Sequence, residues 1–158
     1  MTKIIVFSDS HGTAVNMIQA VNLYQPDLCL HLGDGENDLI TLQDRFPALK
    51  IVSVPGNCDS FSPTQRKRVL EVDGKRIFMT HGDMYHVRYE ENYLTIRYAA
   101  LEENADIVLF GHTHQPYMDY TMGLHIMNPG SVGRGPNPTF GIIEITDQGQ
   151  LFDAIQRV

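Results

Sequence analysis

Seven residues of types that bind metal ions come directly after five short apolar runs of the chain. They are Asp9, His11, Asp34, Asn57, His81, His112 and His114. Apolar runs of this length predict buried strands, and in an open α/β sheet ligands gather outside the carboxyl ends of the strands. Gly33, Gly56 and Gly111 each precede one of the seven and leave room for a sharp turn. We therefore expect the five run ends to meet at one metal site.

Imidazole and carboxylate side chains together form a ligand set that suits Mn, Fe, Zn or Ni better than Mg or Ca alone. No cysteine belongs to the set, which argues against a structural zinc site. Two divalent metal ions roughly 3.5–4 Å apart lower the pKa of a water between them and hold the attacking and leaving oxygens of an in-line displacement. Because only Asp9 and Asp34 are acidic here, two such ions would leave the site positive, which suits a phosphate ester.

Strands and helices alternate in the first third of the chain. We expect strands at 3–8, 28–32 and 50–54 and helices at 13–24 and 37–45. The first helix would present Ala14, Ile18 and Val21 on one face and end before Pro26. This alternation is typical of βαβ units, which form a parallel sheet.

The rest of the chain is richer in hairpins. The Asp-Gly pair at 73–74 lies between two apolar runs and is a strong hairpin signal. A helix is expected at 91–103, with Leu94, Tyr98 and Leu101 on its inner face. Further strands are expected at 106–110, 116–120, 124–127, 139–145 and 151–157. Together the two halves predict an α/β fold with two mixed sheets packed face to face and helices outside.

The ordered set Asp-x-His, Gly-Asp, Gly-Asn, His-Gly and Gly-His-x-His resembles the calcineurin-like metallophosphoesterase superfamily. Gly56-Asn-Cys-Asp59 and Asn128-Pro-Gly-Ser131 resemble its small YfcE-type phosphodiesterases in particular. The likeness runs from Asp9 to about Ser131 and covers most of the chain. It implies a four-layer αββα sandwich of two mixed β-sheets flanked by helices, which we expect to be a single domain over residues 1–158.

The resemblance also implies a role for each ligand position. One metal ion would be held by Asp9, His11 and His114, the other by Asn57, His81 and His112, with Asp34 bridging both. Manganese is the favoured metal, with Fe, Ni or Zn as alternatives. A hydroxide bridging the metals would hydrolyse a small phosphodiester, while Asn57 and His112 steady the phosphoryl oxygens as catalytic residues.

Three positions depart from the family pattern. Cys58 stands where many phosphatases of the superfamily have a histidine general acid, and Asn37 stands where protein phosphatases have the aspartate that orients it. A thiol protonates an alkoxide leaving group poorly, so we expect diesters to be cleaved before monoesters and phosphoproteins hardly at all. An alternative for Cys58 is a small buried residue that packs under its loop. Asp83, a histidine in many YfcE-type members, would repel phosphate or tune a metal-bound histidine.

Three further residues lie in or near these motifs. Arg134 and Asp59 each have two possible roles, and His31 has one. Arg134, in the glycine-rich segment 130–135, would bind a substrate phosphate or lie on a plain surface loop. Asp59 would orient the loop of Asn57 or serve a simple turn. His31 lies within an apolar run and is expected in the core.

Composition limits the partners. The chain has 12 basic and 19 acidic residues, a net charge of −7, which argues against a non-specific nucleic-acid binder. Cys29 lies in an apolar run and Cys58 in a motif, so reduced thiols in a cytoplasmic protein are expected. No apolar run is long enough to cross a membrane, and the N-terminus has no signal-peptide pattern. The natural substrate, the physiological metal and the oligomeric state, a homo-oligomer included, stay open.

Two other functions are compatible with the same pattern. The scaffold subunit of the retromer coat is similar in fold but departs from the metal ligands, so a non-catalytic interaction module is one alternative. Here all seven ligand positions are intact, which favours catalysis. A metal-dependent nuclease, as in the DNA-repair members of the superfamily, is the other alternative. The net charge of −7 and the absence of an added capping domain argue against it.

Overall fold

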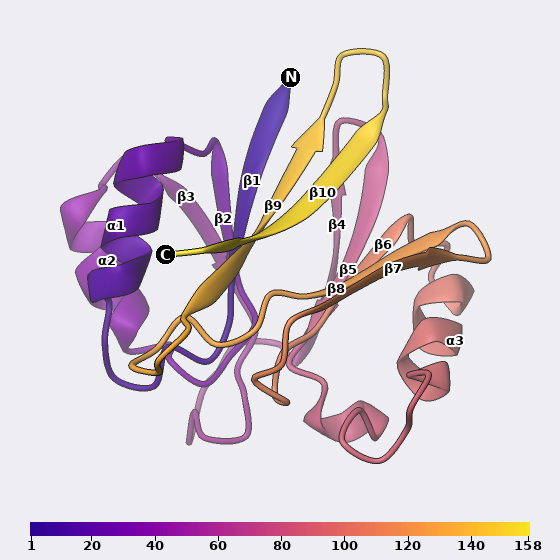
Figure 1. Cartoon of the computed structure of the whole chain (residues 1–158), viewed down its shortest axis with the longest axis horizontal. Helices are drawn as coiled ribbons and strands as arrows, with labels where there is room; N and C mark the ends of the chain where they lie inside the picture. The colour runs from indigo at the N-terminus through magenta and orange to yellow at the C-terminus, as the bar shows by residue number, and fades with distance from the viewer.

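Two five-stranded sheets stack face to face, with helices on both outer faces (Figure 1). The computed structural model describes residues 1–158. Sheet A contains, in spatial order, β10 (Leu151–Arg157), β9 (Thr139–Ile145), β1 (Thr2–Phe7), β2 (Leu28–His31) and β3 (Lys50–Ser53). Sheet B contains, in spatial order, β4 (Lys67–Val72), β5 (Lys75–Thr80), β6 (Ile107–Leu109), β8 (Leu124–Asn128) and β7 (Tyr117–Thr121).

Three α-helices complete the sandwich. The first two, α1 (Val15–Tyr24) and α2 (Asp38–Arg45), lie on the outside of sheet A, and α3 (Leu94–Glu102) lies on the outside of sheet B (Figure 1). A short 3₁₀ helix, η1, spans Asp83–Tyr85. The predicted four-layer αββα sandwich is confirmed. None of the three α-helices has the length and apolar content that a membrane-spanning helix requires.

Both sheets are mixed, and their parallel strands determine where the ligands lie. In sheet A, β1 pairs in parallel with β2 and β2 with β3, whereas β9 is antiparallel to β1. Because β10 is antiparallel to β9, it runs in the same direction as β1. In sheet B, β6 is parallel to both β5 and β8. The carboxyl ends of the parallel strands therefore gather at one edge of each sheet.

The apolar runs of the sequence are continuous because the central strands are covered on both faces. In β1, Ile4 and Val6 pack between the two sheets, and Ile5 and Phe7 pack under α1 and α2. All four side chains are completely buried. Full burial of one such side chain is worth about 1.5–3 kcal/mol, so this layer anchors the loop that follows β1.

The predicted inner face of α3 is wrong at Leu94 and Tyr98, whereas Leu101 is half-buried and packs against the core as predicted. Leu94 and Tyr98 are 49% and 57% exposed, while Ile96, Arg97 and Ala100 are buried. Arg97 is accepted there because its guanidinium donates to the Asp119 carboxylate at 3.0 Å. The helix also starts at Leu94 rather than 91, since the preceding residue has a left-handed φ of 54° that a helix cannot contain.

Candidate metal centre

The predicted ligands meet where the carboxyl ends of five strands converge. Residues 9 and 11 follow β1, residue 34 follows β2, residue 81 follows β5, and residues 112 and 114 follow β6. Their ligand atoms form overlapping groups within 4.8 Å of one another: Asp9, His11 and His114; Asp34, His81 and His112; and His11, Asp34 and Cys58. Asn57, in the loop after β3, is exposed, and its amide nitrogen lies 3.6 Å from the Cys58 sulfur. The predicted meeting of strand ends is therefore present in the fold.

One carboxylate oxygen of Asp9 forms no hydrogen bond within the protein. Asp9 is fully buried, and its Oδ1 makes no hydrogen bond. The same oxygen lies 3.1 Å from Nε2 of His114 and 3.4 Å from Nε2 of His11. Its other oxygen, Oδ2, accepts hydrogen bonds from the Ser8 hydroxyl and the His112 backbone N–H. A buried carboxylate oxygen without a partner is costly, and a bound cation would satisfy it.

The imidazoles form two pairs whose nitrogens face each other. Nε2 of His11 lies 3.2 Å from Nε2 of His114, and Nδ1 of His112 lies 3.2 Å from Nε2 of His81. Asp34 lies between the pairs, with Oδ2 at 3.3 Å from His81 and 3.8 Å from His11. Four imidazoles and two carboxylates in this arrangement fit divalent first-row metal ions. Oδ2 of Asp34 thus lies within 3.8 Å of one imidazole of each pair.

The surrounding groups prepare these side chains to bind a cation. Nδ1 of His81 donates to the Leu32 carbonyl at 2.7 Å, which fixes the ring with Nε2 facing the cluster. Burial would raise the pKa of Asp34, but hydrogen bonds from His81 and the Cys58 N–H hold this pKa far below its usual range. Burial and the neighbouring His81 lower the pKa of His112. The carboxylate is therefore ionised and the His112 imidazole neutral at pH 7.

Five of the six clustered ligands have a backbone conformation that side chains rarely adopt. The positive φ angles are 55° at Asp9, 46° at His11, 59° at Asp34, 69° at His112 and 62° at His114. Such residues cost of order 1–3 kcal/mol each and persist where the surrounding structure enforces them. Their concentration at one cluster supports a functional reason for the strain.

Two glycines make room for the carboxylates. A Cβ on Gly56 would lie 2.1 Å from Oδ1 of Asp34, and a Cβ on Gly111 would lie 1.9 Å from the Ser8 hydroxyl and 2.7 Å from Oδ2 of Asp9. No side chain fits at either position without moving a carboxylate. The room that glycine was predicted to leave beside the ligands is present at these two positions.

Asp59 joins the loop after β2 to the loop after β3. Its Oδ2 accepts the backbone N–H groups of Asp34 and Gly56 at 2.7 and 2.9 Å, and its Oδ1 accepts those of Gly35 and Glu36 at 3.1 Å. The carboxylate therefore positions the Asp34 loop as well as its own. Of the two predicted roles, an orienting one is the better description, and the sequence alone did not show the partners.

His31 is buried behind the cluster, as predicted. Its Nδ1 accepts the Gly33 N–H at 3.1 Å, and its Nε2 lies 3.0 Å from the Ser10 hydroxyl, which in turn donates to Asp38. A neutral imidazole with the proton on Nε2 satisfies every contact, because a proton on Nδ1 would face the Gly33 N–H. Burial lowers the pKa of His31 from its ordinary 6.5 to about 4.

This depressed pKa predicts a loss of stability in mild acid. The unfolded state binds a proton at His31 below pH 6.5, whereas the folded state binds one only below about pH 4. The free energy of unfolding therefore decreases as the pH is lowered through this range. Relative to His31→Asn, whose side-chain oxygen can still accept the Gly33 N–H, the wild type should lose roughly 2 kcal/mol more between pH 7 and pH 5. Urea unfolding with chelator at both pH values measures the difference. An equal loss of unfolding free energy in the wild type and in His31→Asn would show that His31 does not cause the pH dependence.

Cys58 is exposed, so the alternative of a buried packing residue is wrong. Its backbone N–H donates to Oδ1 of Asp34 at 2.8 Å. Desolvation and the Asp34 carboxylate raise the pKa of the Cys58 thiol above its ordinary value, so the side chain is a neutral thiol at pH 7. This protonation state agrees with the expectation that Cys58 is a weak proton donor. Cys29 is the other free cysteine and is buried.

Two arginines and one carboxylate lie around the cluster. Arg88, which the ligand pattern did not include, donates to the His112 carbonyl at 3.1 Å. Asp83 lies close enough to His112 to raise its pKa slightly against the larger effect of burial. The Asp83 carboxylate is 4.0 Å from Arg66, which offsets part of its charge. Asp83 therefore lies near the cluster, as expected, and Arg66 neutralises part of its charge.

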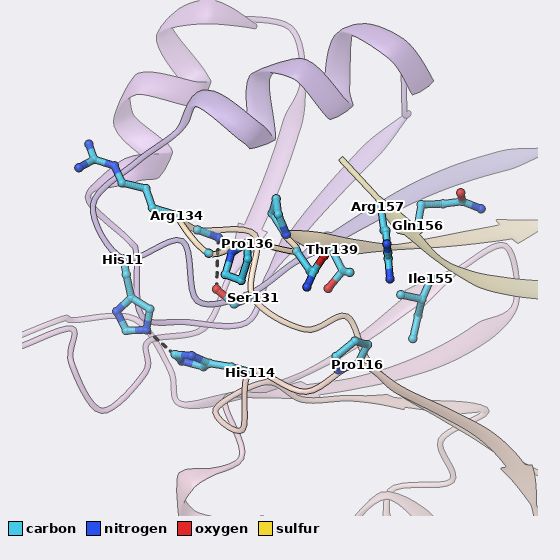
Figure 2. A pocket seen from close by; sticks show the side chains of 14 residues that line it. His11, His114, Pro116, Ser131, Arg134, Pro136, Thr139, Ile155, Gln156 and Arg157 are labelled. Atoms are coloured by element: carbon cyan, nitrogen blue, oxygen red, sulfur yellow. Dashed lines mark hydrogen bonds between the residues drawn. The ribbon is translucent and has the colours of Figure 1, made fainter.

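A cleft of about 860 Å³ opens beside His11 and His114 (Figure 2). It continues along the loop of residues 131–138 to the end of β10. Arg134 lines this cleft, as a substrate-binding residue would, but in Figure 2 its guanidinium points outward rather than toward His114. The structure thus places Arg134 at the rim of the cleft.

Comparisons with known proteins agree with this chemistry. The family model of the calcineurin-like phosphoesterase superfamily domain matches residues 2–148. The probable metallophosphoesterase YsnB of Bacillus subtilis strain 168 is 31% identical over 133 residues, 82% of this chain and 75% of that protein. The phosphodiesterase YfcE of Escherichia coli K12 is 33% identical over 108 residues, 61% of this chain and 54% of that protein.

Two solved structures have a similar fold. A conserved protein of Streptococcus pneumoniae TIGR4, described as a predicted phosphoesterase, matches with a TM-score of 0.76 and 26% identity over 99% of this chain and 98% of that chain. Vps29 of Entamoeba histolytica, solved in complex with Zn²⁺, matches with a TM-score of 0.75 and 21% identity over 98% of both chains. The second likeness concerns the fold alone.

Proposed function

Because the chain belongs to the calcineurin-like phosphoesterase superfamily, we propose that it is a di-metal phosphodiesterase that hydrolyses small phosphodiesters. The chain is a metal-dependent phosphoesterase by its family and its relatives. The proposal adds a centre of two ions, manganese as the favoured metal, a small diester as substrate and a single domain over residues 1–158. The observation that carries it is the cluster of six ligand side chains around the unpartnered Asp9 oxygen.

The family pattern and two of the ligand groups support an assignment of residues to each ion, with Asn57 assigned from the pattern alone. Asp9, His11 and His114 would hold one ion, and His81, His112 and Asn57 the other, with Asp34 shared. When bound, the two ions would supply a nucleophile from water at neutral pH and neutralise the phosphate.

Two of these ligands and two arginines would also act on the substrate. The exposed amide of Asn57 can donate to a phosphoryl oxygen, and the His112 imidazole would steady the phosphoryl oxygens with it. Arg88 positions His112 through its carbonyl. Arg134 at the cleft rim can approach the ester's remote part after a rotamer change.

The preference for diesters is a proposal about the leaving group. Cys58 lies within 4.8 Å of ligand atoms of His11 and Asp34, where a general acid would stand. A neutral thiol is a weak acid, so a good leaving group that departs without a proton is favoured. Monoesters with poor leaving groups would then be slow substrates.

Metal reconstitution tests the proposal. Protein freed of metal by a chelator should be inactive, and addition of Mn²⁺ should restore hydrolysis of bis-p-nitrophenyl phosphate with two ions bound per chain. The protein's kcat/KM on this diester should exceed that on a simple alkyl phosphate monoester by at least about tenfold, because the alkoxide needs a proton that the thiol supplies poorly. A higher rate on the monoester would contradict the role given to Cys58.

Two outcomes would favour the other functions. No turnover with Mn²⁺, Fe²⁺, Ni²⁺ or Zn²⁺, despite two bound ions, would support a non-catalytic interaction module. The fold shared with Vps29 is compatible with that reading, although all seven ligand positions are present here. Rapid cleavage of single-stranded DNA would support a nuclease, against the net charge of −7.

A further inference from the structure

The cleft beside His11 and His114 is lined by basic and not by acidic side chains, although the protein as a whole is acidic. None of the chain's 19 acidic residues lines it, whereas Arg134 and Arg157 do. The chain as a whole carries a net charge of −7. No phenylalanine, tyrosine or tryptophan lines the cleft, so it lacks the large aromatic surfaces on which bases usually stack. A cleft of this kind suits a polar, anionic ligand rather than an apolar or aromatic one.

The wall of the cleft is held in place relative to the metal centre. The Ser131 hydroxyl donates to the Asp9 carbonyl at 2.7 Å, and the Asn16 amide donates to the carbonyls of Val132 and Gly133 at 3.0 and 3.1 Å. The Thr139 hydroxyl donates to the Pro129 carbonyl at 2.6 Å. These contacts join the loop to the residues that follow β1. The cleft is therefore largely pre-formed, as small-molecule sites usually are.

Arg157 lies at the same edge of sheet A as Asp9. The register pairs Gly141 with both Val6 and Ile155, and it pairs Thr139 with Arg157. Arg157 and Thr139 are thus level with Ser8, the residue before Asp9. Two strand spacings separate Arg157 from Ser8, a backbone distance on the order of 10 Å. A small diester can span such a distance, because an arginine side chain reaches across part of it.

The Arg157 guanidinium is free to bind a ligand. It forms no ion pair within 4.0 Å and no side-chain hydrogen bond, unlike the guanidinium groups of Arg76 and Arg97. Side chains two residues apart in a strand share a face, and Ile155 packs against the core between the sheets. In Figure 2 the Arg157 side chain points into the cleft beside Thr139 and Ile155.

We propose that Arg157 binds a second anionic group of the substrate, so that the substrate class is a small phosphodiester whose alcohol carries a carboxylate or a phosphate. This inference rests on the proposed phosphodiesterase function and names the chemistry of its substrate. The scissile phosphate would lie at the metal centre, and the remote anion would lie at the far end of the cleft. The polar lining between them, including Asn137, suits a hydrogen-bonding alcohol.

The test compares three diesters with the same leaving group. Each is a p-nitrophenyl phosphodiester of a three-carbon alcohol that ends in a methyl group, a carboxylate or a phosphate. With Mn²⁺-loaded protein we expect kcat/KM to be about tenfold higher for the anionic diesters than for the propyl diester. The ratio of kcat/KM for each anionic diester to that for the propyl diester shows whether Arg157 prefers a carboxylate or a phosphate. The ratio should fall as salt is added, since the contact is exposed to solvent.

Variants assign the preference to Arg157. In Arg157→Gln the ratio of anionic to propyl diester should fall to near one, and Arg157→Lys should restore most of it. Arg45→Gln, an exposed arginine on α2, should leave the ratio unchanged. Equal rates on all three diesters with wild-type protein, or an unchanged ratio in Arg157→Gln, would overturn the inference while the phosphodiesterase function stands. No turnover of any diester would instead overturn the proposed function, and the inference with it.

Discussion

Asp34→Asn is expected to lower kcat/KM for diester hydrolysis by at least about 10³-fold, because the shared ligand of a two-metal centre contributes several kcal/mol. The Asp34 carboxylate is 4% exposed and lies between the two pairs of imidazoles. Asparagine has the same shape and tolerates the left-handed φ of 59° at this position. Its side-chain oxygen can still accept the Cys58 N–H. The variant therefore removes the negative charge and leaves the fold in place.

Metal content separates this effect from unfolding. The Asn variant should bind fewer than two ions per chain in elemental analysis, while its far-ultraviolet circular dichroism matches that of the wild type. Asp44→Asn is a matched control, because Asp44 is exposed on α2 and away from the cluster. Two bound ions with wild-type turnover in Asp34→Asn would show that Asp34 is not a shared ligand.

Asp59→Asn is expected to destabilise the protein by about 2–4 kcal/mol and to weaken metal binding roughly 10–100-fold. One carboxylate oxygen accepts two backbone N–H groups and the other accepts two more. An amide presents an NH₂ group to one of these pairs, so two hydrogen bonds become contacts between donors. The loops of Asp34 and Asn57 then lose their common anchor, although Asp59 itself is not a predicted ligand.

Urea unfolding of the metal-free protein measures the first effect, and a Mn²⁺ titration measures the second. Asp27→Asn is the control, because Asp27 accepts one backbone N–H, that of Lys3. That variant should lose about 1 kcal/mol and keep its metal affinity. If Asp59→Asn weakened metal binding no more than Asp27→Asn does, the carboxylate would have a general structural role and no special one at the cluster.

The sequence predicted the fold, and it predicted that the six side chains would lie together, because both depend on short patterns. A buried parallel strand needs a continuous apolar run, and a ligand must follow its carboxyl end within a few residues, as His112 follows β6. Cys58 shows the limit of such patterns, because its exposure depends on how one loop lies over Asp34. Short patterns also do not show which sheet the hairpins β7–β8 and β9–β10 join.

The features that the sequence did not show all depend on contacts between distant segments. Asp59 was read as a possible turn residue, since its partners at positions 34–36 lie on another loop. The α3 face was misassigned at Leu94 and Tyr98 because Arg97 is buried with its guanidinium paired to Asp119, which comes from β7. Arg157 became a candidate only when β10 was found beside β9, at the edge of sheet A that carries Asp9.

The two sheets contribute ligands to the same cluster, and this has a mechanical consequence. Asp9, His11 and Asp34 follow strands of sheet A, whereas His81, His112 and His114 follow strands of sheet B. Ions bound by ligands of both sheets would cross-link the two sheets at one edge of the sandwich. Binding energy at the centre would then resist separation of the layers, and it would grow with metal concentration. The metal supply would thus set how tightly the two halves of the protein hold together, apart from any turnover.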